Sequence, residues 1–142
     1  MEPSALLLLI AFMQAKANYN VLIRVDSNAD TTKTEMVSYL SREIRSLGDA
    51  TVVQDQNEAN LILNVVCVDP RKPYYTAAIA VSAPARLFVQ GANCDFKLIE
   101  DKQCLMNLWA DVGTSLRDLA QSIVTRLDST ILEPVRKVRK AK

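Results

Sequence analysis

The sequence predicts an α+β fold, a two-layer sandwich in which two helices cover one face of a mixed β-sheet, in the order β-α-β-β-β-β-α. Two segments, residues 32–47 and 105–132, carry apolar residues at intervals of three and four, the spacing of an amphipathic helix. The segments before and between them alternate or run continuously in apolar and β-branched residues, as strands do. With 142 residues, of which 49% are hydrophobic and 23% charged, the chain has the size and composition of one globular domain.

The first strand and the first helix are predicted near the start of this domain. Residues 19–27 (YNVLIRVDS) alternate in the period of a strand. Thr32 stands three residues before Glu35, the spacing of a capping box, so we expect the helix to begin there. Gly48 stands where a residue in the left-handed conformation would end that helix.

Four further strands are expected between the two helices. The run LILNVVCV is almost entirely apolar, which indicates a central strand covered on both faces. Pro70 and Pro73 are expected to bracket the loop after it, and Pro84 marks either a bend or the connection of a hairpin. The four strands are predicted at residues 50–55, 61–68, 74–90 and 96–101, the last as a short edge strand.

The chain is expected to finish in a long helix over residues 105–132, with Pro134 ending it. At 1.5 Å per residue such a helix is about 40 Å long, longer than a domain of this size is wide. We therefore expect either a break near Gly113 or final turns that extend into solvent.

The amino-terminal residues 1–17 fit a signal peptide. Residues 5–13 are nine consecutive apolar side chains, whereas a membrane-spanning helix needs about 20. Ala15-Lys16-Ala17 supplies the small-residue cleavage pattern, so the mature chain would start at Asn18. The positive charge usual before the apolar run is missing, and the alternative is a buried helix or strand. Export would make the protein periplasmic or secreted, with no transmembrane anchor after cleavage.

The three cysteines fit export but allow an alternative. A disulfide between Cys94 and Cys104 would close a loop of about ten residues and stabilise the fold by about 2.7 kcal/mol. Cys67 lies in an apolar strand and is expected to be a small core residue. Three free thiols in a reducing compartment are the alternative, because spacing does not fix connectivity.

The domain is predicted to span residues 18–134, followed by a basic tail at 135–142. The tail holds five cations and no acid. Because the net charge of the whole chain is +1, the remaining residues carry about −4. A mildly acidic body does not favour nucleic acid as a partner, and the tail lacks an aromatic residue for base stacking. We expect a frayed, solvated terminus rather than a lipid or nucleic-acid contact. The basic residues are Arg136, Lys137, Arg139, Lys140 and Lys142.

The composition excludes the common catalytic and cofactor sites. Without histidine there is no His-based acid/base pair and no mixed Cys/His zinc site. The three cysteines form no Cys-x-x-Cys pair, and three dispersed glycines cannot form a phosphate-binding loop. Asp26 and Asp30 follow the first strand, but Asn28 stands where an Asp-x-Asp site needs its second acid, so we interpret them as a turn. We therefore predict no enzyme, no metal and no cofactor.

Two features of the strands bear on binding. Arg24 and Asn64 interrupt apolar strands, and we expect them to face solvent on the uncovered side of the sheet. Tyr74 and Tyr75 follow the basic segment Arg71-Lys72, and Tyr and Arg are favoured at interfaces, so these four residues are the candidate interaction surface. A strand start that buries one ring and exposes the other explains the two tyrosines almost as well.

Residues 42–65 (REIRSLGDATVVQDQNEANLILNV) resemble a pattern of bacterial envelope proteins, in which a helix ends in Gly and a short strand precedes an Ala-Asp-apolar strand. The chain is similar over residues 19–90 to the TolB amino-terminal domain and to the curli-secretion and penicillin-binding-protein-activator lipoproteins. This resemblance implies the anticodon-binding-domain-like fold and a protein-binding role without catalysis. Asn60 replaces the acid of the Ala-Asp pair, and no functional residue carries over.

The leading hypothesis is thus an exported, non-enzymatic envelope domain that binds a partner protein. The first alternative is a small histidine-free enzyme or ligand-binding protein that uses carboxylates and tyrosines. The second is a cytosolic module that binds nucleic acid or a lipid surface through the basic tail.

Overall fold

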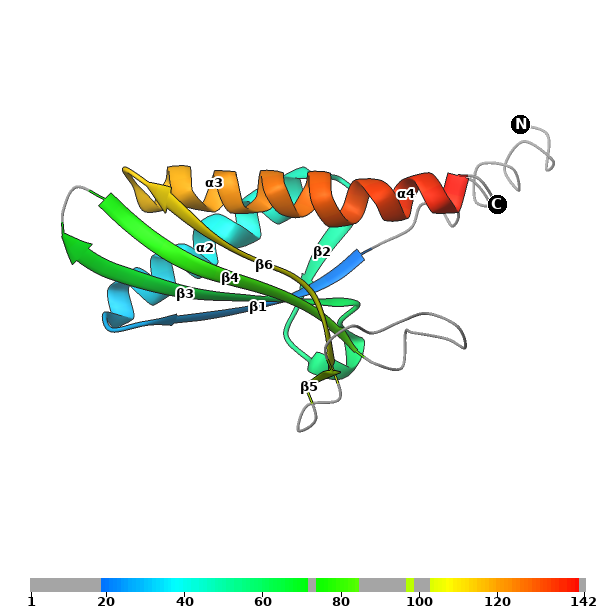
Figure 1. Ribbon diagram of the computed structural model, residues 1–142, viewed down its shortest axis with the longest axis horizontal. Coiled ribbons are helices and arrows are strands. Elements are labelled where there is room, and N and C mark those ends of the chain that lie inside the picture. The colour runs from blue at the N-terminus through cyan, green and yellow to red at the C-terminus, as the bar shows by residue number, and fades with distance from the viewer. Residues whose placement is uncertain (1–18, 72–73, 85–96, 99–102, 141–142) are drawn as a thin grey trace, which may run out of the picture.

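The computed structural model describes residues 19–71, 74–84, 97–98 and 103–140. They form one mixed sheet with helices packed on one of its faces (Figure 1). The elements in chain order are β1 (Tyr19–Ser27), α2 (Asp30–Ser46), β2 (Ala50–Val53), the 3₁₀ helix η1 (Gln56–Glu58), β3 (Leu61–Arg71), β4 (Tyr74–Pro84), β5 (Lys97–Leu98), β6 (Gln103–Gly113), α3 (Leu116–Leu127), a π segment (Asp128–Leu132) and α4 (Glu133–Lys140).

The strand order in the sheet is β2-β1-β3-β4-β6-β5. β1 runs parallel to both of its neighbours, β2 and β3, while the other pairs are antiparallel. The predicted α+β sandwich with a mixed sheet is therefore confirmed. The sheet has one strand more than the predicted order, because β6 lies where a helix was expected.

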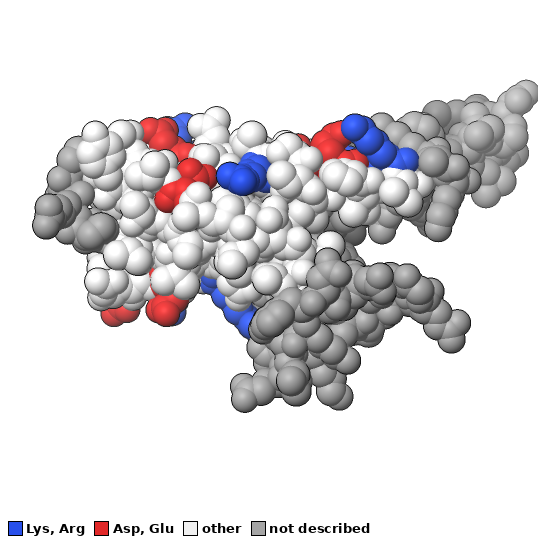
Figure 2. All heavy atoms as spheres, in the orientation of Figure 1, with Lys and Arg blue, Asp and Glu red and all other residues white. Residues whose placement is uncertain are grey.

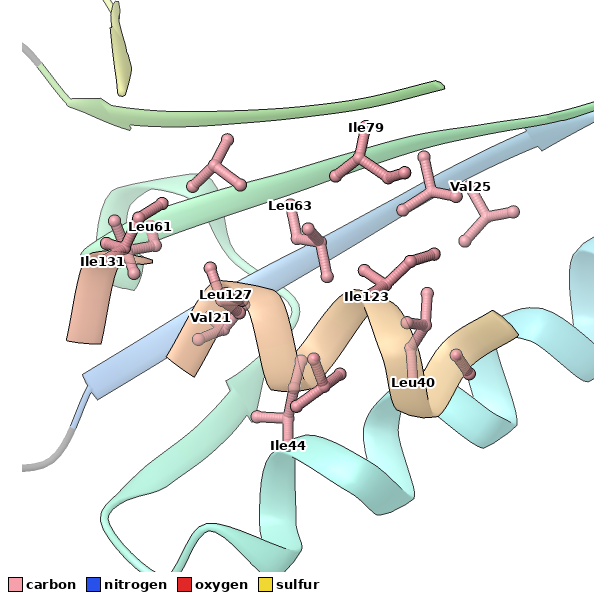
Figure 3. Close-up of a cluster of buried hydrophobic side chains, with 14 of the residues drawn as sticks. Val21, Val25, Leu40, Ile44, Leu61, Leu63, Ile79, Ile123, Leu127 and Ile131 are labelled. Atoms are coloured by element: carbon pink, nitrogen blue, oxygen red, sulfur yellow. The ribbon is translucent and has the colours of Figure 1, made fainter. Parts of the chain in front are cut away.

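The core lies between the sheet and the helices (Figure 3). Each helix contributes a stripe at intervals of four residues, and alternate residues of β1, β3 and β4 complete the cluster. Full burial of one such side chain is worth about 1.5–3 kcal/mol, so these stripes hold the two layers together. The stripes are Met36, Leu40 and Ile44 on α2 and Leu119, Ile123 and Leu127 on α3.

The two ends of α2 differ in how well the sequence predicted them. The capping-box prediction is wrong: α2 begins at Asp30, its N-cap Ala29 offers no side-chain bond, and Thr32 lies buried within the helix. A side chain that faces the core cannot cap the helix terminus, which explains the difference. At the other end Gly48 has φ of +85°, and its N–H donates to the Arg45 carbonyl at 3.3 Å, as predicted.

The predicted helix over residues 105–132 begins only at Leu116, because residues 103–113 form strand β6. Pairing with β4 over ten residue pairs outweighs the local helical spacing of Leu105, Leu108 and Val112. Gly113 ends the strand, and the Ser115 hydroxyl then accepts the Asp118 N–H at 3.1 Å as the N-cap of α3.

Pro134 does not end the last helix, contrary to the prediction. Helix α3 passes into the π segment and then into α4, where Pro134 is the second residue. Immediately before the proline, the Glu133 N–H bonds to the Asp128 carbonyl five residues back, so the α-helical bonding pattern is already interrupted where Pro134 has no N–H to donate. Residues 135–140 of the predicted tail are therefore helical, whereas Lys142 lies outside the described residues.

Arg136 corrects the prediction of a solvated tail. Its guanidinium donates to Asp49 at 2.6 and 2.7 Å and to Asp128 at 2.5 Å, and it lies 5.9 Å from the centre of the Tyr19 ring. The Arg136 side chain is only 18% exposed. Lys137 is exposed, and the side chains of Arg139 and Lys140 are not among those described. One member of the basic cluster thus belongs to the fold.

Strand β3 continues past the predicted boundary at Pro70 to Arg71, where it pairs with Tyr74. The register shifts between Val68 and Arg71, and such a bulge accommodates a proline that cannot donate to the ladder. Residues 1–17, Lys72 and Cys94, which carry other sequence predictions, lie outside the described residues.

Candidate functional site

Within the part of the chain that the structure describes, the face of the sheet opposite the helices is covered at one end only. There the segment that contains η1 packs on the sheet, and Leu22, Ala59 and Ile62 are buried together with Val53 against them. Asn60 ties this segment down, since its N–H donates to the Asn20 carbonyl and its side-chain carbonyl accepts the Asn20 N–H, each at 2.8 Å. These buried residues form a second, small hydrophobic cluster that does not extend beyond the η1 segment.

Beyond that cover, three strands present apolar side chains in register. The antiparallel pairs of β3, β4 and β6 align Val68 with Thr76 and Val112, Val66 with Ala78 and Ala110, and Asn64 with Ala80 and Leu108. Paired residues share a face of the sheet, so the rows form one continuous surface. We call it the open face, and it consists of Val66, Val68, Tyr74, Thr76, Ala78, Ala80, Leu108, Ala110 and Val112.

The large apolar members of the open face are strongly exposed. Leu108 is 65% exposed, Val112 56%, and Val66 and Val68 46% each. Single exposed apolar residues are ordinary, but a contiguous group on a sheet face indicates a surface that another molecule covers.

The structure separates the two predicted tyrosines. Tyr74 is 56% exposed and lies on the same side of β4 as Thr76 and Ala78, at the end of the open face. Tyr75 points to the other side and is partly buried against the main core. The interpretation in which one ring is buried and one is exposed is therefore correct, and Tyr74 extends an apolar surface. Arg71 pairs with Tyr74 through its backbone, and its side chain is not among those described.

Polar and charged residues border the open face on the β1 side. Arg24 and Asp26 are exposed there, beside Asn64 and Val66, so Arg24 lies on the uncovered side as predicted. The Arg24 guanidinium donates to the Gln56 side chain at 2.7 Å, and the Asn64 amide donates to the Ala80 carbonyl at 3.2 Å. Figure 2 shows a wide area below α3 that has no Lys, Arg, Asp or Glu side chain. A charge-free centre with a polar rim is typical of protein interfaces.

Two backbone N–H groups of β6 donate hydrogen bonds to side chains of the same strand. The Asn107 carboxamide accepts the Leu108 N–H, and the Asp111 carboxylate accepts the Val112 N–H, each at 2.9 Å. The Ser122 hydroxyl of α3 donates to Asp111 at 2.7 Å and holds it in place. Such bonds oppose the addition of a further strand at this position.

A separate surface hollow runs along α3. It is lined by Asp118, Gln121, Ser122, Thr125, Arg126 and Ser129. The Arg126 guanidinium lies 5.5 Å from the centre of the Trp109 ring beside it. Asp26, Asp30 and Tyr74, which the enzyme alternative requires, do not line this hollow. Among the described residues, no three His, Cys, Asp or Glu side chains gather in a metal-binding arrangement.

The cysteine predictions are tested only in part. Cys67 is a free and buried cysteine on the core side of β3, and burial raises the pKa of its thiol because the charged form is desolvated. Cys104 is buried at the start of β6. Cys94 lies outside the described residues, so its pairing with Cys104 stays a prediction.

Leu108 and Val112 were missed as site residues because the sequence assigned them to a helix stripe. The available signal was the alternation Leu108, Ala110, Val112, which the intervening Trp109 concealed.

No helix in the described part of the chain is long and apolar enough to span a bilayer.

No family model matches the chain, and no curated protein matches it in sequence. In structure, it is similar to the hypothetical protein CT253 from Chlamydia trachomatis, with a TM-score of 0.53 and 9% identity over 81% of this chain and 99% of that chain. PelC from Paraburkholderia phytofirmans, in two dodecamer crystals, aligns with TM-scores of 0.49 and 0.45, 12% and 10% identity, 81% of this chain, and 88% and 87% of PelC. The similarity to CT253 concerns the fold alone.

Proposed function

We propose that this chain is an exported, non-enzymatic domain of the bacterial envelope, periplasmic or secreted, that binds a partner protein through the open face. The observation that carries the proposal is the registered group of exposed apolar side chains on β3, β4 and β6. Covering a Val or Leu side chain completely yields about 1.5–3 kcal/mol, and several of them together can drive association. Tyr74 at one end adds the residue type that most often anchors interfaces.

Two further observations support the remaining parts of the proposal. Export is supported by the apolar run at residues 5–13 followed by Ala15-Lys16-Ala17. A role without catalysis is supported by the lack of histidine and by a surface hollow that does not gather Asp26 or Asp30.

Photo-crosslinking in the native host tests the proposal. The photoreactive residue benzoylphenylalanine is placed at Leu108 or at Val112, and at Arg117 on the exposed side of α3 as the matched control. We expect adducts with one discrete protein from the two open-face positions and none from the control, in periplasmic or secreted material. Equal adducts from Arg117, or no adduct from the open face, would show that another surface binds.

The mature amino terminus tests export separately. Intact mass of the purified protein should correspond to a chain that starts at Asn18. A mass that includes Met1 in protein from the envelope fraction would contradict cleavage by this signal.

A further inference from the structure

We infer that the partner presents to the open face an amphipathic helix about four turns long, which lies along β4 with its apolar stripe against the sheet. This inference rests on the proposed function and adds the class of ligand. It is carried by the side-chain sizes on the open face, by its area and by the bonded N–H groups of β6.

The side-chain sizes fit one helix. The middle strand β4 contributes the small residues Ala78 and Ala80, with Val66 of β3 beside the first and Leu108 of β6 beside the second. The row that follows is higher, because Thr76 lies there between Val68 and Val112. Adjacent strands lie about 4.8 Å apart, so the side chains of β3 and β6 stand about 10 Å apart. A helix with its side chains is about 10 Å wide, so its apolar ridge can settle over Ala78 and Ala80.

The area favours a helix over a second copy of this chain. The open face is three strands wide from Thr76 to Ala80, and Tyr74 extends it along β4 to a length of about 24 Å, so its area is at most about 340 Å². A stable complex of two globular surfaces buries about 800 Å² on each partner, so the open face alone would hold a second copy weakly. A helix of about 16 residues is about 24 Å long and matches the face along β4.

The edge of the sheet makes strand addition unfavourable. A strand added to β6 would need the N–H groups of Leu108 and Val112, which already donate to Asn107 and Asp111. Ser122 holds the Asp111 carboxylate in that position. Binding through side chains on the open face breaks none of these bonds.

The chemistry of the helix follows from the open face and its border. Its contact stripe carries no charge, since a charged group buried against Ala78, Leu108 and Val112 would lack a partner. On the β1 side Asp26 lies beside Val66 and Arg24 beside Asn64, which favours a Lys or Arg of the helix opposite Asp26 and an Asp or Glu opposite Arg24.

Designed peptides test the inference on the full chain. One fluorescein-labelled peptide of about 16 residues carries Leu at helical intervals of three and four, a second has the same composition scrambled, and a third alternates Val and Thr as a strand. Fluorescence anisotropy should show the helical peptide binding at least about tenfold more tightly than the other two. Amide NMR shifts should appear at Val66, Ala78 and Leu108.

Filling the space over β4 provides the matched variant. Ala78 is exposed, so Ala78→Leu should leave the melting temperature unchanged, yet it should weaken the helical peptide by about tenfold or more. Thr125→Leu, which adds a similar side chain on the exposed side of α3, should leave the affinity unchanged.

Several outcomes would overturn the inference. Equal binding of the helical and scrambled peptides, or no effect of Ala78→Leu, would show that no helix lies over β4. Tighter binding of the strand peptide with shifts at Asn107 and Asp111 would assign the site to strand addition. A dimer in sedimentation equilibrium that Leu108→Asp abolishes would assign the open face to a second copy. If the helical peptide does not bind preferentially, or if the strand peptide binds more tightly, crosslinks from Leu108 in cells would still support the proposed function. The absence of such crosslinks would refute both proposals.

Discussion

Among single residues, Arg136 makes the most charged contacts that the described structure shows. It joins α4 to the turn between α2 and β2 through two bonds to Asp49, 87 positions away in the chain, and a third to Asp128. The hydrogen bond to Asp49 and the charge of Asp128 raise the pKa of Arg136, so this residue stays charged wherever the protein is folded. The basic carboxyl-terminal segment therefore includes a structural residue that charge counting does not distinguish from its neighbours.

Replacing Arg136 should destabilise the fold. Arg136→Met removes the guanidinium that donates to Asp49 and Asp128 at a partly buried site, so we expect a loss of about 2–3 kcal/mol in the free energy of unfolding by urea. Arg136→Lys should recover only part of it, because an ammonium lacks the planar fork. Lys137→Met, at an exposed neighbouring position, is the control and should change stability by less than about 0.5 kcal/mol. Equal losses at both positions would contradict this role.

At the scale of elements, the two helix starts were predicted in the wrong place, and the reason is physical. A Ser or Thr caps a helix only where the chain before it is extended and its hydroxyl meets free N–H groups. Ser115 meets this condition, with its hydroxyl on the Asp118 N–H, while Thr32 lies inside α2 and faces the core. Sequence spacing alone does not distinguish these environments.

Substitution at the observed cap of α3 and at the predicted capping box of α2 should separate them. Ser115→Ala should lower the free energy of unfolding by about 1 kcal/mol, because the Asp118 N–H loses its acceptor. Glu35→Ala should change it by less than about 0.5 kcal/mol, because α2 has no side-chain cap for Glu35 to complete. Chemical denaturation of both variants provides the measurement. A larger loss from Glu35→Ala would reinstate the capping box.

Two strands and one helix were predictable from the sequence, since β1, β3 up to Val68, and α2 with Gly48 lie where periodicity placed them. The prediction that β3 is covered on both faces was wrong, because Val66 and Val68 are each 46% exposed on the open face. β6 was not predictable, because Trp109 packs in the core while Leu108 and Val112 lie on the open face. The three together imitate a helix stripe. Leu108 and Val112, which belong to the candidate site, are thus the residues that made β6 resemble a helix in sequence. Local sequence rules are expected to fail most often at functional sites.

At the scale of the whole molecule, one face of the sheet provides stability and the other is the proposed binding surface. The face under α2 and α3 holds the main core, and the open face adds no packing within the described domain. The fold should therefore be complete without a bound partner, and stability and binding should respond to different residues.

This division predicts opposite effects for two leucines. Leu119→Ala, in the core, should reduce the free energy of unfolding by about 2–5 kcal/mol. Leu108→Ala, on the open face, should change it by less than about 0.5 kcal/mol while it weakens capture of the helical peptide. Urea titration measures the first quantity and anisotropy the second. A loss above about 1.5 kcal/mol from Leu108→Ala would mean that the open face is packed within the domain itself.

The π segment Asp128–Leu132 has a consequence for insertions and deletions. Its hydrogen-bonded rings enclose one residue more than those of an α-helix, so the helix that follows is turned relative to α3 by about the 100° that one residue represents. Loss of any one residue there would rotate Arg136 away from Asp49 even if every remaining side chain were kept. In the evolution of this domain, substitutions at its exposed residues Ser129 and Thr130 should be accepted more readily than an insertion or deletion anywhere in the segment.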